Sequence, residues 1–498
     1  MEISQDNLRQ IVEAVMSNQD LFPQPKAQES MAAPRRGATI YDFVNKPPMA
    51  ADAYASMGKG VYADVQQAIE RAYQAQLQYM QSCSVSDRKR IIKNIRKKMV
   101  EHKETMARMA LDESGLGRYE DKVAKVELAA TKTPGVELLL TDAVSGDDGL
   151  TIEEMAPFGL VGGVTPVTNP METIINNVIG LLAGGNSVVY NVHPSSKKTC
   201  AFTVDKINQA IVEMGGPEDM VTMVAEPSME SLSAIMKSDK VRLLLGTGGP
   251  GLVRSLLSSG KKAIGAAAGN PPVLVDETAD LELAAKEIIA GASFDNNLLC
   301  IAEKEVFVVD AVADDLMFAL VRQGAAMLTP TQATQVTELA LEKGKDGSWH
   351  TKKEWIGKDA TLFLKGIGAQ ANSDCKLLLM EADVQHPFVQ LEQMMPVLPI
   401  VRVANVQEGM RLAVETEHGN RHTASIFSKN TDNITAFSKA INTTIFVSNA
   451  STMAGVGYGG EGYATFTIAG ATGEGLTCAR TFTRKRRYVA GNGNFRVI

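Results

Sequence analysis

The sequence contains few cysteines, five among 498 residues, and they lie far apart. An odd number of scattered thiols forms neither a disulfide framework nor a CxxC metal pair. We therefore expect a protein of the reducing cytosol in which a single cysteine is available as a working thiol. The five are Cys83, Cys200, Cys300, Cys375 and Cys478.

Long apolar runs, histidine clusters and an excess of positive charge are also missing. No 18-residue uncharged apolar run occurs, and polar residues interrupt every apolar stretch near the start, so neither a membrane-spanning helix nor a signal peptide is expected. The net charge of −7 points to no nucleic-acid partner and no anionic membrane surface. The six dispersed histidines show no ligand spacing, so no metal site is predicted.

Residues 1–18 differ in character from the rest of the chain. Their apolar residues recur at helical spacing, which predicts an amphipathic helix, and residues 19–38 are rich in Pro, Ala, Ser and Gln, which predicts a flexible linker. So short a helix is marginal alone in water, so its apolar face needs a partner surface. We favour docking on another protein over an arm packed on this one. The apolar face is formed by Ile3, Leu8, Ile11, Val12, Val15 and Met16.

Beyond the linker, the pattern changes from helices to alternating strands and helices. Long helices are predicted over 61–80, 86–114 and 119–139, followed by an exposed hairpin over 140–155. From residue 158 onward, short apolar strands each precede a helix, and 42 glycines suit the many tight turns between them. These features predict an α/β fold with a doubly wound parallel sheet, and the chain length predicts two or three domains. Strand-like pieces after 477 could pair with the hairpin.

A glycine-rich turn and one cysteine are the candidates for chemistry. The turn at 244–251 ends a strand and opens a helix at Pro250, where backbone N–H groups could approach a pyrophosphate, although a plain tight turn explains it equally well. Cys300 lies between a helical run from Leu281 and a strand over 305–309, where a thiol can protrude from a loop. Its thiolate would be a nucleophile, but most lone cysteines are small buried hydrophobes, so position alone does not decide its role.

Five segments in register resemble the motifs of the aldehyde dehydrogenase superfamily, across residues 40–490. They are the strand and loop 157–170, the segment 183–195, the turn 246–251, the cysteine segment 293–304 and the acidic segment 391–398. Finer features are similar to the CoA-acylating aldehyde dehydrogenases of bacterial microcompartments, whose N-terminal helix and linker address the enzyme into the compartment. These finer features are 269–272, 294–304, 417–424, 459–463 and 479–483.

The resemblance implies a domain organisation as well as a fold. An aldehyde dehydrogenase-like α/β fold would place a nucleotide-binding domain for NAD and CoA at 39–139 and 156–266. A catalytic α/β domain with the nucleophile would span 267–469. A small β oligomerisation flap would combine 140–155 with 470–498. The implied partners are a short-chain aldehyde such as propionaldehyde or acetaldehyde, CoA, further copies of the chain as a dimer or tetramer, and, through residues 1–18, shell or lumen proteins of a cytoplasmic microcompartment.

The same resemblance assigns roles to single residues. Cys300 would add to the aldehyde carbonyl, while the Asn169 amide and the Cys300 backbone N–H would hold the developing oxyanion. Collapse of this adduct would reduce NAD and leave an acyl thioester for CoA to displace. Candidate cofactor-binding residues are Thr165, Pro166, His193, Pro194, Gly246, Thr247, Gly251 and Glu392.

Two departures from the wider superfamily bear on the reaction. Ala266 takes the place of the Glu that activates water in hydrolytic members, so the acyl-enzyme should hydrolyse slowly and wait for another thiol. The usual ribose-contacting Lys is replaced by Asn191 or Val192. His418 and His422 could assist deprotonation of the CoA thiol, although a structural hydrogen bond is the favoured reading.

Two alternatives remain at this stage. A hydrolytic aldehyde dehydrogenase would release a free acid, and Ala266 argues against it. A non-catalytic microcompartment scaffold would bind shell proteins through residues 3–18, but it would need none of Asn169, Cys300 and Glu392.

Deleting residues 1–20 should leave kcat and KM nearly unchanged and release the enzyme from purified microcompartments or from a shell-protein pull-down. The buried apolar face could contribute a few kcal/mol at ~25 cal/mol per Å², enough for weak multivalent recruitment. Replacing Leu8 and Ile11 with Glu should have the same effect without shortening the chain. Continued co-purification of the truncated enzyme, or loss of its activity, would contradict the targeting role.

Overall fold

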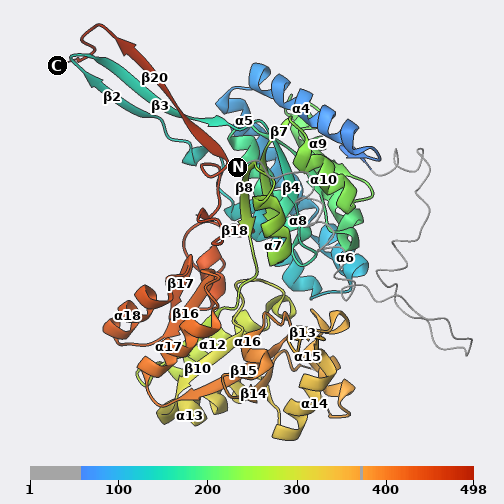
Figure 1. Cartoon of the computed structure of the whole chain (residues 1–498), viewed down its shortest axis with the longest axis vertical. Coiled ribbons are helices and arrows are strands. Elements are labelled where there is room, and N and C mark those ends of the chain that lie inside the picture. Colours follow the sequence, from blue (N-terminus) through green and yellow to red (C-terminus); the bar gives the residue numbers. More distant parts are fainter. Residues whose placement is uncertain (1–57, 371–373, 498) are drawn as a thin grey trace, which may run out of the picture. The chain divides into compact units, whose positions relative to one another are not determined.

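The computed structural model describes residues 58–370 and 374–497 (Figure 1). The chain divides into two units, 1–47 and 48–498. The first unit, with the predicted helix over 1–18 and linker over 19–38, lies outside the described residues. Everything that follows concerns the second unit.

The first sheet consists of six parallel strands in the order β1-β6-β5-β4-β7-β8. From β4 the chain proceeds outward to β5 and β6 on one side, and then returns to β7 and β8 on the other. In doubly wound sheets a ligand cleft forms where the strand order reverses, at the carboxyl ends of the strands. The strands are β1 (Val61–Tyr62), β4 (Leu160–Val164), β5 (Ser187–Asn191), β6 (Val221–Val224), β7 (Val241–Thr247) and β8 (Lys262–Ala266).

The helices around this sheet follow the predicted order, with three corrections. Residues 61 and 62 form strand β1, and the first helix begins only at Val65 after the side-chain cap of Asp64. The predicted helix over 86–114 is two helices, with the break at His102. The helix predicted to reach 139 stops at Lys132 because Pro134 follows. The helices are α4 (Val65–Ser82), α5 (Val85–Glu101), α6 (Lys103–Ser114), α7 (Tyr119–Lys132), α8 (Pro170–Ala183), α9 (Lys197–Glu213), α10 (Met229–Lys237) and α11 (Pro250–Leu257).

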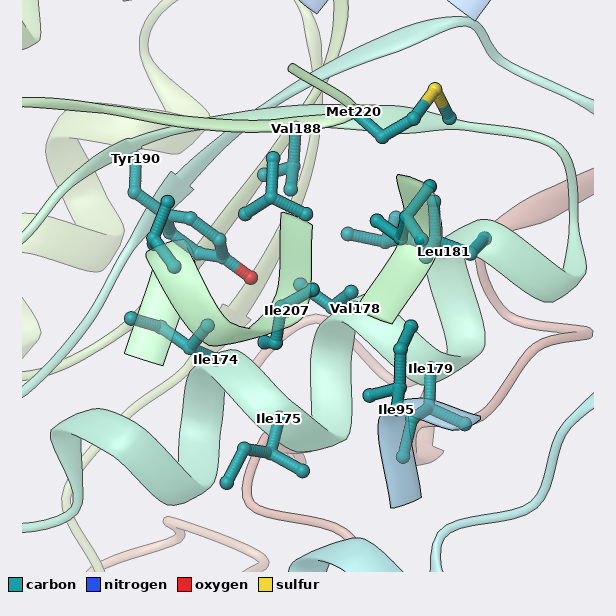
Figure 2. Close-up of a cluster of buried hydrophobic side chains, with 14 of the residues drawn as sticks. Ile95, Ile174, Ile175, Val178, Ile179, Leu181, Val188, Tyr190, Ile207 and Met220 are labelled. Carbon is teal, nitrogen blue, oxygen red and sulfur yellow. The ribbon is translucent and has the colours of Figure 1, made fainter. Parts of the chain in front are cut away.

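Helix α8 is the centre of the first core. Every one of its residues is buried, which suits a helix that is apolar on nearly all sides. Figure 2 shows isoleucine, valine and leucine side chains of α8 packed against residues of β5, α9 and α5. This packing fixes the start of α8, where Asn169 stands as the N-cap residue before Pro170.

The second sheet has seven parallel strands in the order β11-β14-β15-β10-β9-β16-β17. The strands are β9 (Pro272–Val275), β10 (Glu305–Val309), β11 (Ala326–Met327), β14 (Leu378–Glu381), β15 (Val397–Val403), β16 (Thr423–Phe427) and β17 (Ile445–Ser448). Its helices are α12 (Leu281–Ala292), α13 (Asp310–Arg322), α14 (Pro330–Ala340), α15 (Ala360–Gly366), α16 (Pro387–Gln390), α17 (Val406–Thr416) and α18 (Thr431–Ile441). The prediction of an α/β fold with parallel sheets is confirmed.

Three antiparallel strands form a separate ribbon (Figure 1). The predicted hairpin is present as β2 (Asp142–Gly146) and β3 (Gly149–Pro157), and the C-terminal strand β20 (Thr483–Gly491) pairs along the whole of β3. The pairing of the tail with the hairpin is therefore confirmed, although its part in oligomerisation stays a prediction. The division at residue 267 also stays a prediction, although the two parallel sheets lie on either side of it.

Across the described part of the chain, no helix combines the length and the apolar character that crossing a bilayer requires.

Truncating Leu181 should test the central role of α8. Its side chain is fully buried, so Leu181→Ala should lower the free energy of unfolding by ~2–5 kcal/mol through lost burial and the cavity left behind. Leu257→Ala on α11 is the matched control, because half of that side chain is already exposed. Thermal unfolding followed by circular dichroism should show a clear fall in Tm for Leu181→Ala only; equal shifts would contradict the assignment of the core.

Candidate active site

A cavity of about 260 Å³ opens at the carboxyl ends of β4, β7 and β8. Its walls come from 166–169 after β4, 247–249 after β7 and 266–268 after β8. The opposite wall is the loop 298–301, together with Glu392 and Met394. The cavity therefore lies where the strand order of the first sheet reverses, as expected for a ligand site in this architecture.

Six of the ten predicted site residues line this cavity. They are Asn169, Pro166, His193, Thr247, Cys300 and Glu392. Thr165 and Pro194 are next to lining residues but do not line the cavity themselves. Gly246 and Gly251 are also absent from its walls.

The two remaining glycines have different local settings. A Cβ on Gly246 would lie 2.2 Å from Leu256 Cδ1, so a side chain there would collide with α11, which packs against β7. A Cβ on Gly251 would meet no atom within 4 Å. Close helix-to-strand packing thus explains the first glycine without any ligand, and phosphate binding at either one stays a prediction.

Strained backbone places Cys300 at the cavity. After α12 ends at Ala292, three consecutive residues, Asp295, Asn296 and Asn297, have φ angles of 47°, 55° and 65°. Non-glycine residues in this left-handed region cost ~1–3 kcal/mol each and persist only where other contacts hold them. This segment turns the chain back so that 298–301 faces the cavity.

Side-chain hydrogen bonds hold each residue of this turn. Asp295 accepts a bond from the Arg118 backbone N–H at 2.7 Å, and Asn296 Nδ2 donates to the Gly357 carbonyl at 2.9 Å. Asn297 Nδ2 donates at 2.9 Å to the carbonyls of both Ala292 and Glu303. The three residues are fully or almost fully buried, so water does not compete for these bonds.

Lys304 supports the cysteine segment from behind. Its side chain is completely buried, and Nζ donates to the carbonyls of Asn297 at 2.9 Å and Leu299 at 3.3 Å. The carbonyl of Leu299 and the N–H of Cys300 belong to one trans peptide and point in opposite directions. Binding of this carbonyl by Lys304 therefore directs the Cys300 N–H away from the lysine.

The surroundings of Cys300 favour the protonated thiol in the free protein. The residue is only partly exposed, and burial together with the nearby Glu392 carboxylate raises the pKa of the thiol to about 12. The charge of Lys304 and the backbone N–H groups of Cys300 and Ile301 act in the opposite direction. A nucleophilic role thus requires loss of this proton, or a change of environment when ligands bind.

Glu392 presents a partly buried carboxyl group to the same cavity. One oxygen accepts a long hydrogen bond from the Gly269 N–H at 3.3 Å. Burial raises the pKa of this carboxyl, while the charge of Lys304 opposes the shift. Its remaining acceptor positions suit a ligand that carries hydroxyl groups.

Asn169 lies across the cavity wall as the N-cap residue of α8. Its Oδ1 accepts a hydrogen bond from Lys125 Nζ at 2.8 Å, and its Nδ2 donates to Thr168 Oγ1 at 3.2 Å. The amide has two N–H groups, so one remains for a ligand in the cavity. A carbonyl carbon at Cys300 and an oxygen near Asn169 would suit attack by the thiol.

The residues that stand where the wider superfamily has its Glu and Lys have defined surroundings in the structure. Ala266 lines the cavity as predicted, with Ala267 and Ala268 beside it, so this wall offers methyl groups where a general base would stand. The Asn191 side chain is engaged by Ser228 and Ser231, and Val192 is buried. Neither residue offers a cation to the cavity.

The histidines have structural contacts. His193 Nδ1 accepts the Ser195 N–H at 3.2 Å, and burial lowers the pKa of His193. His418 Nε2 bonds to the Gln390 carbonyl at 3.0 Å, while His422 is buried beside Thr423 and burial lowers its pKa to about 4. Neither His418 nor His422 lines the cavity, and a part in CoA deprotonation stays a prediction.

Sequence patterns alone missed two groups of residues at the site. One is the set of buried charges behind the walls, Lys122, Lys125, Glu172, Asp295 and Lys304. Lysines on the apolar face of a helix, as in 119–132, are a signal that could have identified the first two. The other group is the apolar lining, which includes Leu128, Leu298, Leu299, Ile301, Met453, Val456, Phe466 and Ile468.

Within the described residues, no group of three or more His, Cys, Asp or Glu side chains could hold a metal ion.

Comparisons with known proteins agree with this geometry. Residues 37–475 match the model of the aldehyde dehydrogenase family. The chain is 45% identical over 441 residues to the acetylating acetaldehyde dehydrogenase EutE of Salmonella typhimurium, which covers 88% of this chain and 94% of that protein.

Two solved structures are similar over most of their length. One is a propionaldehyde dehydrogenase from the fucose utilisation bacterial microcompartment of Clostridium phytofermentans, 49% identical with a TM-score of 0.84, covering 87% of this chain and 98% of that one. The other is the propionaldehyde dehydrogenase of Rhodopseudomonas palustris with bound CoA and an acylated cysteine. It is 48% identical with a TM-score of 0.85, covering 88% of this chain and 99% of that one. The resemblance inferred from the motifs is confirmed.

Alkylation of Cys300 by iodoacetamide should rise roughly tenfold per pH unit between about pH 7 and 10, because a thiol with a pKa of about 12 stays protonated throughout that range and only its thiolate reacts. Intact-mass analysis of a Cys478→Ala variant would follow the reaction, since Cys478 is the other cysteine that is not buried. A rate that levels off below pH 8 would show that the thiolate forms in the free protein.

Proposed function

Because this chain belongs to the aldehyde dehydrogenase family, we propose that it is a CoA-acylating aldehyde dehydrogenase. It converts a short-chain aldehyde, CoA and an oxidised nicotinamide cofactor to acyl-CoA and reduced cofactor. The observation that supports this most strongly is a cavity with Cys300 and Asn169 in its walls and Ala266 where a water-activating carboxylate would stand. The similar proteins are named for activities of this type.

The protein supplies a nucleophile and two oxyanion donors. Cys300 Sγ attacks the carbonyl carbon of the aldehyde after its proton is lost, and a tetrahedral adduct forms on the sulfur. The Asn169 Nδ2 group and the Cys300 N–H donate hydrogen bonds to the oxygen that gains negative charge. Loss of one such donor usually lowers kcat ~100-fold or more. The nicotinamide cofactor, when bound, accepts the hydride, and an acyl thioester then remains on Cys300.

The residues of the cavity fit a cofactor with ribose hydroxyl groups. The partly buried Glu392 carboxylate has acceptor positions to spare and would bind the hydroxyls of the nicotinamide ribose. Thr247, Pro166 and His193 complete the neighbouring wall. We assign NAD rather than NADP because a 2′-phosphate needs a cationic partner, and Asn191 and Val192 provide none.

The wall at 266–268 explains why CoA would release the product. These three residues include no carboxylate and no histidine, so the position that the water-activating Glu takes in hydrolytic members offers no general base. The thiol of CoA is a better nucleophile and exchanges one thioester for another of nearly equal energy, so the reaction runs in both directions. CoA and the dinucleotide each carry an adenosine and a pyrophosphate, and we propose that they use the same groove in turn.

The apolar lining favours a short aliphatic aldehyde. Leu128, Phe466 and Ile468 leave a small cavity with few polar groups near Cys300. Propionaldehyde and acetaldehyde are the substrates named for the similar proteins, and we propose the same class here.

We further propose that the enzyme works in the lumen of a bacterial microcompartment, since one similar enzyme comes from such a compartment. Residues 1–18 would dock on a shell or lumen protein. The ribbon of β2, β3 and β20 would join subunits into a dimer or tetramer, because apolar residues are exposed on both of its faces. These are Val144, Tyr488 and Val489.

The direct test of the proposed function is product analysis with and without CoA. Purified enzyme with propionaldehyde and NAD should yield propionyl-CoA and NADH when CoA is present, and little free acid when it is absent. Equal rates of acid formation with and without CoA would support a hydrolytic enzyme. Absence of NADH under every condition would support a scaffold.

Restoring a base should change how the acyl-enzyme is divided between hydrolysis by water and transfer to CoA. Ala266→Glu places a carboxylate in the cavity wall, so acid should form without CoA several-fold faster than in the unmodified enzyme. Ala266→Gln is the matched control, since its amide has the same size and no basic oxygen. If both variants fold and neither forms more acid, water is excluded by shape and the missing base is not the cause.

A further inference from the structure

Behind the wall of the cavity lies a cluster of buried charges, which the mechanism above does not use. Helix α7 contributes Lys122 and Lys125, one turn apart, and helix α8 contributes Glu172. The turn before the cysteine segment contributes Asp295. All four side chains are almost completely buried, so each charge must be compensated within the cluster.

Lys125 is at the centre of this cluster. Its Nζ lies 2.6 Å from Asp295 Oδ2, 2.8 Å from Asn169 Oδ1, 3.2 Å from the Thr168 carbonyl oxygen and 3.4 Å from Glu172 Oε1. Burial alone would lower the pKa of Lys125, but the Asp295 and Glu172 carboxylates more than offset it and raise the pKa. The side chain is therefore an ammonium ion at any pH at which the protein works.

An ammonium ion fixes the orientation of the Asn169 amide. It has three N–H donors and no acceptor, so the amide atom that faces it must be the oxygen. The nitrogen of the amide then faces the other way, toward Thr168 Oγ1 and the cavity. An amide free to turn by 180° would present its oxygen to the cavity instead, and that oxygen would repel a developing oxyanion.

We propose that Lys125 is a positioning residue that holds Asn169 with its N–H group directed at the substrate oxygen, and so prepares one half of the oxyanion hole before substrate arrives. This rests on the proposed function, in which Asn169 is an oxyanion donor. Lys125 lies behind Asn169 and is not part of the cavity wall, so its direct contacts with that wall are to the Asn169 amide and the Thr168 carbonyl.

Lys122 provides a matched comparison within the same cluster. It is equally buried and lies 3.2 Å from the same oxygen of Asp295, but its contact is with this carboxylate and it makes no hydrogen bond to Asn169. Burial and the charge of Lys125 lower the pKa of Lys122. A variant of Lys122 therefore disturbs the cluster without releasing the Asn169 amide.

A double-mutant cycle on the first turnover tests the proposal. The variants are Lys125→Met, Asn169→Ala and both together, and the readout is the rate of the NADH burst, which precedes any reaction with CoA. Lys125→Met should slow the burst ~100-fold in the unmodified chain but less than ~3-fold in the Asn169→Ala background, because the donor it positions is already gone. Affinity for the cofactor, measured by its fluorescence, should change little.

Lys122→Met should show no such coupling, and its effect should be the same whether residue 169 is Asn or Ala. Lys125→Arg keeps a positive charge and N–H donors between Asp295 and Glu172, so its burst should be slowed less than that of Lys125→Met. The rate at which iodoacetamide alkylates Cys300 distinguishes loss of an oxyanion donor from damage to the segment that carries the nucleophile. Loss of the donor should leave this rate nearly unchanged.

The proposal would be overturned if Lys125→Met slowed the burst by the same factor with Ala at residue 169 as with Asn. It would also be overturned if Lys125→Met lowered the alkylation rate of Cys300 as much as it lowered the burst rate. Failure of the proposed function looks different. An unmodified enzyme that releases acid without CoA would disprove CoA acylation and still show the coupling in its first turnover. An unmodified protein with no burst at all would overturn both.

Discussion

The carboxylate of Asp295 is fully buried, and it binds the Arg118 N–H and the ammonium groups of both Lys122 and Lys125. These contacts hold the first of three consecutive residues in the left-handed region, which the chain would otherwise avoid. Gly117 shows how tightly this carboxylate is enclosed, because a Cβ there would lie 2.0 Å from Asp295 Oδ1. The nucleophile segment, helix α7 and the start of α8 thus depend on one buried ion cluster, and removal of any charge would leave another unpaired in the core.

The consequence is a cavity in which two walls are each held from behind by a buried lysine. Lys125 holds Asn169 at the start of α8, and Lys304 holds the peptide before Cys300 through the Leu299 carbonyl. Both donors proposed for the oxyanion are thereby fixed from behind. Preorganised donors of this kind need no rearrangement when charge develops, which is why such sites stabilise the transition state more than water does. The high pKa of the Cys300 thiol is a consequence of the same burial.

The sequence could predict much of the fold because the parallel strands are short, apolar and each followed by a helix. It also identified Cys300, Asn169 and Glu392 through motifs, and these residues do meet at one cavity. Local patterns failed where the cause is distant in the chain. No Pro or Gly marks the break at His102, and the reason for Gly246 is its packing against Leu256 rather than a phosphate. Lys125 was overlooked because a lysine on an amphipathic helix normally reaches water, and only the fold shows that carboxylates from two other segments surround it.

The central claim is that the acyl group waits on Cys300 until CoA removes it. Intact-mass spectrometry of the enzyme after a single turnover with propionaldehyde and NAD, without CoA, tests this directly. The account predicts one added propionyl group, located on Cys300 by peptide mapping, stable for many times the turnover period and discharged as propionyl-CoA when CoA is added. The result that would contradict this account is enzyme that carries no added acyl group, together with one full equivalent each of NADH and free propionate.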